Sequence, residues 1–193
     1  AASGDYLLFL NDDVEVLHDD WLDVLMAEAA RPEVGVVGAQ LLYPDGKVQH
    51  AGMFLSRSMP GTARHAFRFA ASDDPCYFGL ALSQRELTCV TGACMMVRRE
   101  VFDAVAGFDE AHAVVNNDID FCLRLRATGR SVIFTPHARL LHHELASRAH
   151  LKDDFDRSAF LQTWGDLCLA GDPYVSPSIS TEADDFVPEE EPL

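Results

Sequence analysis

The apolar positions of the chain follow two patterns, uninterrupted runs and helical spacing. The uninterrupted runs predict strands, and they lie at residues 6–10, 34–43, 48–55, 87–97 and 131–135. Helical spacing predicts helices at residues 19–30, 99–105, 117–128 and 150–170. Pro136 is expected to end the last strand. Strands and helices in this order indicate an α/β fold, in which ligands bind at the carboxyl ends of parallel strands.

Two segments lack these patterns. Residues 56–85 mix Gly, Pro, Arg, His and aromatic residues without a clear period, and we expect a long, partly ordered loop that is mobile or forms a flap beside the ligand cleft. Near the end of the chain, acids and prolines alternate with little to bury, which favours disorder. We therefore expect one domain over residues 1–172 and an acidic, disordered tail over residues 173–193.

Composition narrows the range of functions. A chain of 193 residues with 48% apolar content suits one soluble domain that can bury a core. The formal net charge of −16 argues against nucleic acid as a partner, because phosphate binding relies on clustered Lys and Arg. No apolar run approaches the roughly 18–20 residues that a membrane-spanning helix needs. The five cysteines lack CxxC spacing, so we expect buried free thiols in a reducing cytosol.

Three polar clusters border the apolar elements: Asn11-Asp12-Asp13, Asn117-Asp118-Ile119-Asp120 and His142-His143-Glu144. An acidic pair after a buried strand can share a divalent cation with substrate phosphates, although the same acids can simply cap the next turn. Asp118 can likewise be a helix N-cap, and Asp120 can pair with Arg124 one turn later. His142 or His143 can complete a metal shell, or can be solvated.

The order and surroundings of these clusters resemble those of glycosyltransferase family two over most of the chain. Residues 8–13 look like the family's DxD-type segment, and residues 117–120 are similar to the segment that holds its catalytic base. Further similar segments lie at residues 43–52, 91–99, 107–110, 142–148 and 172–177. The first of these is common in rhamnosyl- and galactofuranosyl-transferase-like members.

The resemblance implies a GT-A fold, with a mainly parallel (mixed) sheet flanked by helices. It covers the C-terminal portion of the family's catalytic domain. The family's first strands and helices, which form the base- and ribose-binding pocket, are therefore expected to precede residue 1. With a domain truncated in this way at its N-terminus, little or no transfer is expected from the chain alone.

The resemblance also implies roles for individual residues. Asp13 is expected to bind Mg²⁺ or Mn²⁺, and Asp12 to contact the donor's ribose or the waters of the metal. Gly92 is assigned to donor binding, and a glycine inside a strand also suggests a close backbone approach. Asp118 is expected to deprotonate the acceptor hydroxyl. His142 or His143 is expected to reach the metal from the far side, with His143 slightly preferred.

These roles imply an inverting, metal-dependent transfer of a sugar from a nucleotide-diphosphate sugar to a saccharide or lipid-linked acceptor, in cell-surface polysaccharide biosynthesis. An in-line displacement needs one general base, while the metal stabilises the leaving diphosphate. A glycoside hydrolase would instead need two opposed carboxyl groups. The absence of a QxxRW motif favours single-sugar transfer. We expect a cytoplasmic protein, and leave peripheral association with the inner face of the membrane open.

Two alternatives stay open at this point. The chain can be a non-catalytic carbohydrate-binding or assembly module derived from a glycosyltransferase, in which the polar clusters serve only as caps and ion pairs. It can also be a phosphatase or nucleotidyltransferase, but this fits less well because the sequence contains no glycine-rich loop that would cradle a phosphate.

Overall fold

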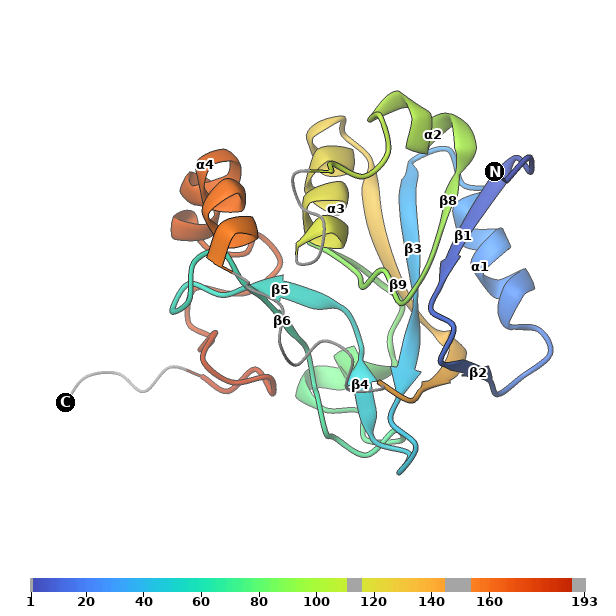
Figure 1. Ribbon diagram of the computed structural model, residues 1–193. Helices are drawn as coiled ribbons and strands as arrows, with labels where there is room; N and C mark the ends of the chain where they lie inside the picture. Colours follow the sequence, from blue (N-terminus) through green and yellow to red (C-terminus); the bar gives the residue numbers. More distant parts are fainter. Residues whose placement is uncertain (1, 111–115, 145–153, 189–193) are drawn as a thin grey trace.

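The computed structural model describes residues 2–110, 116–144 and 154–188. Within these residues a seven-stranded sheet lies between helices, with a two-stranded sheet beside it (Figure 1). The path of the large sheet is β1 (Tyr6–Leu10), β8 (Cys94–Arg98), β3 (Val34–Leu42), β9 (Ser131–His142) and β2 (Val14–Val16). Off this path, β4 (Val48–His50) pairs with β3, and β7 (Arg85–Leu87) pairs with β9.

Strands β1, β3 and β9 run in the same direction. β3 and β9 pair in parallel, while β8 lies between β1 and β3 and is antiparallel to both. β2, β4 and β7 are also antiparallel to their partners. The predicted α/β fold with a mixed sheet flanked by helices is confirmed. Antiparallel pairing is more extensive than the apolar runs suggest, because such runs report burial on both faces and not strand direction.

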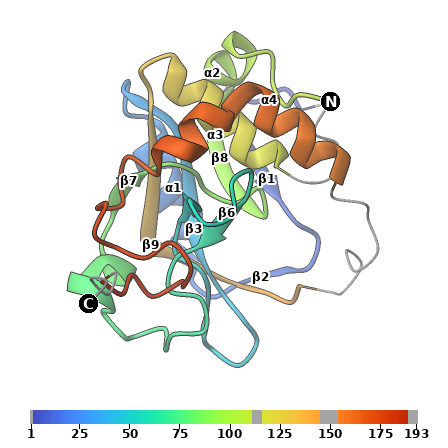
Figure 2. The ribbon, with the colours of Figure 1, turned by 90° about the vertical axis from the view of Figure 1, so that its left-hand side faces the viewer.

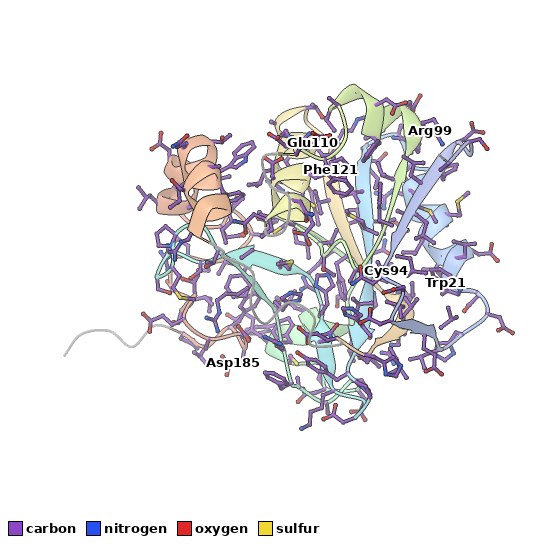
Figure 3. All side chains as sticks on the ribbon, viewed as in Figure 1. Trp21, Cys94, Arg99, Glu110, Phe121 and Asp185 are labelled. Carbon is purple, nitrogen blue, oxygen red and sulfur yellow. The ribbon has the colours of Figure 1, made fainter. Side chains whose placement is uncertain are left out.

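Two hydrophobic layers enclose the sheet. Val37 and Met96 point to the layer covered by α1 (Trp21–Ala29), whereas the neighbouring Val36 and Val97 point to the opposite layer. That opposite layer contains side chains of α2 (Arg99–Ala104), α3 (Asn117–Ala127) and α4 (Asp154–Ala170). Figure 2 shows these three helices on the same side, and Figure 3 labels Phe121 of α3 and Trp21 of α1 on opposite sides of the sheet. Every residue of β3 is buried as a result.

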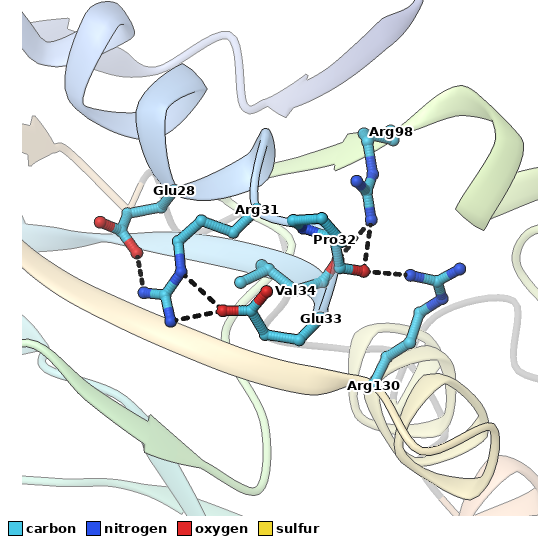
Figure 4. A network of polar contacts seen from close by, with 7 residues as sticks. All are labelled: Glu28, Arg31, Pro32, Glu33, Val34, Arg98 and Arg130. Carbon is cyan, nitrogen blue, oxygen red and sulfur yellow. Dashed lines mark hydrogen bonds and ion pairs between the residues drawn. The ribbon is translucent and has the colours of Figure 1, made fainter.

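Arginine side chains hold together the end of the sheet where β3 begins. The carbonyl oxygen of Pro32 accepts hydrogen bonds from Arg98 at 3.0 Å and from Arg130 at 2.7 Å (Figure 4). Arg31 in the same turn forms ion pairs with two glutamates, at 2.8 and 2.7 Å. These contacts join the start of β3 to the end of β8 and to the turn between α3 and β9. At the other end of the sheet lie Asn11, Asp13 and His142.

Three predicted strands have different bounds in the structure. The segment 48–55 divides into β4 and β5 (Met53–Leu55), because Gly52 adopts φ +91° and a Cβ there would lie 2.2 Å from Leu87. The segment 87–97 contains the last residue of β7 and the first four residues of β8. The predicted end at Pro136 is wrong, because β9 continues to His142. The pairing with β3 shifts register across the proline, where a missing N–H is tolerated.

The segment 56–85 contains more regular structure than expected. β6 (Ala63–His65) pairs with β5, and a 3₁₀ helix that is kinked at Phe78 and Gly79 covers Tyr77–Leu82. Phe67, two residues after β6, is fully buried. The segment is therefore anchored to the domain through β6 and Phe67. No helix in the described part of the chain is long and apolar enough to cross a membrane.

The segment 173–188 packs against the domain, in contrast to the expected disordered tail. Phe186 is 7% exposed and lies 5.0 Å from Phe54 and 4.9 Å from Phe67, between ring centroids. Asp184 forms an ion pair with Arg64 at 2.8 Å. Composition does not reveal this packing, because it depends on a few buried side chains such as Ile179 and Phe186 and on hydrogen bonds from Arg57 to the backbone of the segment. The remaining residues of the expected tail, 189–193, lie outside the described part of the chain.

Replacement of Phe186 by alanine should lower the free energy of unfolding by about 3 kcal/mol or more, since truncation of a buried Phe typically costs about 3–5 kcal/mol. The matched control is Phe78→Ala, because Phe78 is 89% exposed and its loss should change stability by less than about 0.5 kcal/mol. Urea denaturation of both variants measures the difference. Equal stability of the two variants would show that the Phe186 side chain does not contribute to the core.

Candidate active site

The polar segments meet at the end of the sheet where β1, β3 and β9 finish. Asn11 follows β1, His142 is the last residue of β9, and Asp13 precedes β2, which pairs with β9. The Asn11 N–H donates to the carbonyl of Ala93 at 2.9 Å, and the His143 N–H donates to the carbonyl of Asp13 at 3.0 Å. These backbone bonds hold the loop after β1 against both β8 and the end of β9.

Asp13 and His142 form the centre of this region. The Oδ1 atom of Asp13 lies 3.1 Å from Nε2 of His142, and both side chains are largely buried. The side-chain amide of Asn11 also approaches Nε2 of His142, at 3.1 Å. The imidazole thus has one ring nitrogen directed at a carboxylate and an amide from the loop after β1.

The other ring nitrogen of His142 contacts β4. Its Nδ1 atom lies 2.6 Å from Oε1 of Gln49, a buried residue. The Nε2 atom of Gln49 lies 3.3 Å from the carbonyl oxygen of His142 and 3.3 Å from Oε2 of Glu144. Both nitrogens of the His142 ring are therefore engaged by residues of the site.

A small cavity of about 90 Å³ opens beside His142. Its walls come from the loops after β1 and before β8, from β4, from the end of β9 and from the segment 56–85, and they consist of Asn11, Gln49, His65, Arg68, Thr91, Ala93, His142 and Glu144. Two wall residues, His65 and Arg68, belong to the segment that was expected beside the cleft. That position agrees with the expectation, and movement of the segment as a flap stays a prediction.

A pair of neutral histidines supports this wall. Nδ1 of His50 and Nδ1 of His65 lie 3.1 Å apart, and His65 also hydrogen-bonds the backbone of Gln49. Burial, together with the nearby positive charges, lowers the pKa of His65 to about 4 and the pKa of His50 well below its usual value. Both imidazoles are therefore uncharged at neutral pH.

Asp118 reaches the same region from the first turn of α3. Its Oδ2 atom accepts a hydrogen bond from the Gly92 N–H at 2.8 Å, and its Oδ1 atom accepts one from the Ile119 N–H at 2.9 Å. Gly92 stands between Thr91 and Ala93, which line the cavity. The residue in the N-cap position is Asn116, so helix capping by Asp118 explains only its bond to Ile119. The bond to Gly92 holds the carboxylate beside the cavity wall.

Asp120 has a structural role instead. It is 2% exposed, and its two oxygens bind Arg124 at 2.7 Å and the indole N–H of Trp164 at 2.9 Å. The predicted ion pair with Arg124 is confirmed. Because Trp164 lies on α4, Asp120 joins α3 to α4 and is poorly placed to receive a proton from a substrate.

The remaining predicted site residues lie in different surroundings. Asp12 is exposed, and His143 is directed away from Asp13 toward Glu15, at 3.4 Å. Gly92 has room for a side chain, because a Cβ there would lie 3.5 Å from Asp118, an ordinary contact. The close backbone approach that was expected at Gly92 is the hydrogen bond from its N–H to the Asp118 carboxylate.

Sequence reasoning assigned no role to several residues of this site: Asn11, Gln49, His65 and Arg68. Gln49 could have been identified from the sequence, because it belongs to the segment 43–52, which resembles the family. No residue of that segment had been given a role. His65 and Arg68 carry no such signal, since they lie in an aperiodic segment that the fold brings to the site.

The donor atoms present suit a divalent cation that shares its ligands with a substrate. In the described part of the chain, no group of three or more His, Cys, Asp or Glu side chains could hold a metal. The pair of Asp13 and His142 offers one carboxylate oxygen and one imidazole nitrogen, both acceptable to Mg²⁺ or Mn²⁺. Phosphate oxygens and water would have to complete the coordination, as is usual when such a cation binds with a nucleotide.

Comparison with solved structures defines the class of fold. The crystal structure of GalNAc-T7 with UDP, GalNAc and Mn²⁺ matches with a TM-score of 0.63, covering 87% of this chain and 34% of that chain at 13% sequence identity. The architecture is thus that of the GT-A glycosyltransferases. The family described as "Glycosyltransferase like family 2" matches residues 1–160, and the chain belongs to this family.

Several relatives carry names from O-antigen biosynthesis and rhamnosyl transfer. The chain is 44% identical over 189 residues to O-antigen biosynthesis protein RfbC of Myxococcus xanthus, covering 95% of this chain and 14% of that protein. It is 29% identical over 157 residues to N-acetylglucosaminyl-diphospho-decaprenol L-rhamnosyltransferase of Mycobacterium tuberculosis, covering 74% and 48%. Rhamnosyltransferase WbbL of Escherichia coli is 28% identical over 166 residues, covering 80% and 61%. The chain thus spans less than two thirds of each of these relatives.

Proposed function

We propose that this domain carries out metal-dependent transfer of a sugar, with inversion, from a nucleotide-diphosphate sugar to a saccharide or lipid-linked acceptor. The observation that supports the proposal is the contact of Asp13 with His142 at 3.1 Å in a family 2 domain. Asp118 accepts a hydrogen bond from Gly92, whose neighbours Thr91 and Ala93 line the same cavity as His142. The names of the relatives favour synthesis of a cell-surface polysaccharide and make a rhamnosyl donor the first candidate to test.

Asp13 and His142 are the proposed metal ligands, Mg²⁺ or Mn²⁺ being the cation. His142 is preferred to His143 because its Nε2 atom lies 3.1 Å from the Asp13 carboxylate, whereas His143 is half-exposed and faces Glu15. When bound, the cation would stabilise the charge of the departing nucleotide diphosphate as a Lewis acid. Asp12, exposed at the start of the same loop, is proposed to contact the donor's ribose.

Asp118 is the proposed general base. Two backbone N–H groups, from Gly92 and Ile119, fix the orientation of its carboxylate, and an ionised carboxylate can accept more than two hydrogen bonds. An acceptor hydroxyl that reaches this carboxylate can transfer its proton there while its oxygen attacks the anomeric carbon from the face opposite the diphosphate. Gly92 then serves the site through its N–H, which anchors the base.

The test is transfer by the full-length protein from a panel of UDP-, GDP- and dTDP-linked sugars, with Mn²⁺ or Mg²⁺ and with a chelator. We expect transfer to require the metal, and NMR of the product to show an inverted anomeric configuration. The adjacent histidines provide a matched pair, in which His142→Ala should weaken Mn²⁺-dependent thermal stabilisation and transfer, and His143→Ala should leave both largely intact.

Different outcomes would point to different corrections. Full activity with the chelator, or an unchanged response of His142→Ala to Mn²⁺, would exclude this metal site. Saccharide binding without transfer from any donor would favour the alternative of a non-catalytic carbohydrate-binding module derived from a glycosyltransferase.

A further inference from the structure

The segment 43–52 has no role in the proposed function, yet it supplies a side chain to the centre of the site. Gln49 lies on β4, which pairs with the end of β3 through Leu41–His50 and Leu42–Val48. Its side chain is buried and contacts His142 through both ends of the amide. The strand pairs on either side of Gln49 and the bond from His65 fix the backbone from which this amide extends.

The surroundings of the Gln49 amide determine which end faces the imidazole. Its Nε2 atom lies 3.3 Å from two oxygen atoms, the carbonyl of His142 and Oε2 of Glu144, and both can only accept a hydrogen bond. The reverse orientation would place the amide oxygen against these two oxygens. Oε1 is therefore the atom that lies 2.6 Å from Nδ1 of His142, and Nδ1 must carry a proton in order to donate to it.

A proton on Nδ1 of His142 determines whether the other ring nitrogen, Nε2, donates or accepts a hydrogen bond. In a neutral imidazole with hydrogen on Nδ1, Nε2 carries a lone pair. That lone pair faces the Asn11 amide, which can donate to it, and the Asp13 carboxylate, which cannot. Two acceptor atoms 3.1 Å apart repel each other unless a proton or a cation lies between them. A divalent cation bound between Nε2 and the Asp13 carboxylate would be held by both atoms.

We propose that Gln49 is a positioning residue that fixes His142 in the tautomer with hydrogen on Nδ1, so that Nε2 and the Asp13 carboxylate face one divalent cation. The inference rests on the proposed function, because it concerns the same metal site. Metal-binding histidines usually donate their second ring N–H to an oxygen of the protein, and that bond orients the ring and raises its basicity. Gln49 supplies this oxygen.

The test uses Mn²⁺ alone as the probe, with binding measured from the EPR signal of free Mn²⁺. Gln49→Leu, which removes the amide at similar size, should weaken Mn²⁺ binding about 10- to 100-fold, as loss of such an outer partner typically does. The matched control is Gln40→Leu, because Gln40 is also buried but donates to the carbonyl of Ala81 in the 3₁₀ helix instead of contacting His142. This control should bind Mn²⁺ as the unmodified protein does.

A second measurement does not depend on metal. Two-bond ¹H–¹⁵N NMR spectra of the metal-free protein should show His142 with hydrogen on Nδ1, and a mixture of tautomers in Gln49→Leu. The exchange Gln49→Glu with Glu144→Gln keeps an oxygen for Nδ1 and an amide opposite it, and should restore both the tautomer and most of the Mn²⁺ affinity. A variant that merely disturbed packing would not be rescued by this exchange.

The outcomes separate the two proposals. If Gln49→Leu keeps both the tautomer and the Mn²⁺ affinity while His142→Ala loses the affinity, the metal site stands and the role of Gln49 is overturned. If His142→Ala binds Mn²⁺ normally, the metal site of the proposed function fails, and the role of Gln49 fails with it. Weakened binding in Gln49→Leu, normal binding in Gln40→Leu and recovery in the exchange variant would together support the role of Gln49.

Discussion

Replacement of Asp118 by asparagine should reduce transfer by the full-length protein by about 10²- to 10⁴-fold, the range over which general-base assistance acts. The amide keeps the size of the carboxylate but cannot take the acceptor's proton. It can also accept only one of the two backbone hydrogen bonds, from Gly92 and Ile119, at its single oxygen. Turnover per folded molecule, with donor binding measured by calorimetry, checks this expectation, and donor affinity should change far less than turnover.

The control for this variant lies two residues along the same helix. Asp120→Asn should lower stability, because Asp120 binds Arg124 and Trp164 in a buried position, while turnover per folded molecule should stay close to that of the unmodified protein. If Asp118→Asn retained near-normal turnover, Asp118 would serve only to hold Gly92 and the start of α3. If only Asp120→Asn lost turnover, Asp120 and not Asp118 would be the general base.

Replacement of Asp13 by asparagine should weaken Mn²⁺ binding by more than about 100-fold, beyond the range of about 10- to 100-fold typical of an outer partner. Loss of a metal ligand should also lower donor affinity and transfer together, because the cation holds the diphosphate in the ground state and stabilises it as it leaves. Mn²⁺ titration by EPR and donor titration by calorimetry measure the two effects. An exposed acid of the following loop, as in Asp19→Asn, provides the control.

Without metal, the same variant should unfold at an unchanged or higher temperature. The amide at position 13 can donate to the lone pair on Nε2 of His142, where the carboxylate presents only acceptors. Differential scanning calorimetry in chelator measures this change. A lower unfolding temperature would contradict this expectation and show that the Asp13 carboxylate stabilises the metal-free protein more than the amide does.

Local pattern together with the family resemblance located part of the candidate site. Asp13 follows the apolar run 6–10 and Asp118 opens a helix, so the sequence alone predicts that these two lie at one edge of the sheet, whereas a metal-binding role for His142 or His143 came from the family resemblance. The choice between His142 and His143 could not be made in this way. β9 ends at His142, and its pairing with β2, which starts directly after Asp13, brings this imidazole and not that of His143 to Asp13.

The sequence by itself determined the class of fold, the family and the order of the polar clusters, because these depend on short-range periodicity and on motifs that each occupy a few residues. Three contacts are visible only in the tertiary structure. Residues 56–85 contribute His65 and Arg68 to the wall of the cavity, and Phe186 packs against Phe67 in the core. Gln49 contacts Nδ1 of His142. Each of these contacts joins segments far apart in the chain. Such contacts follow from strand register and side-chain packing, which no local pattern of residues encodes.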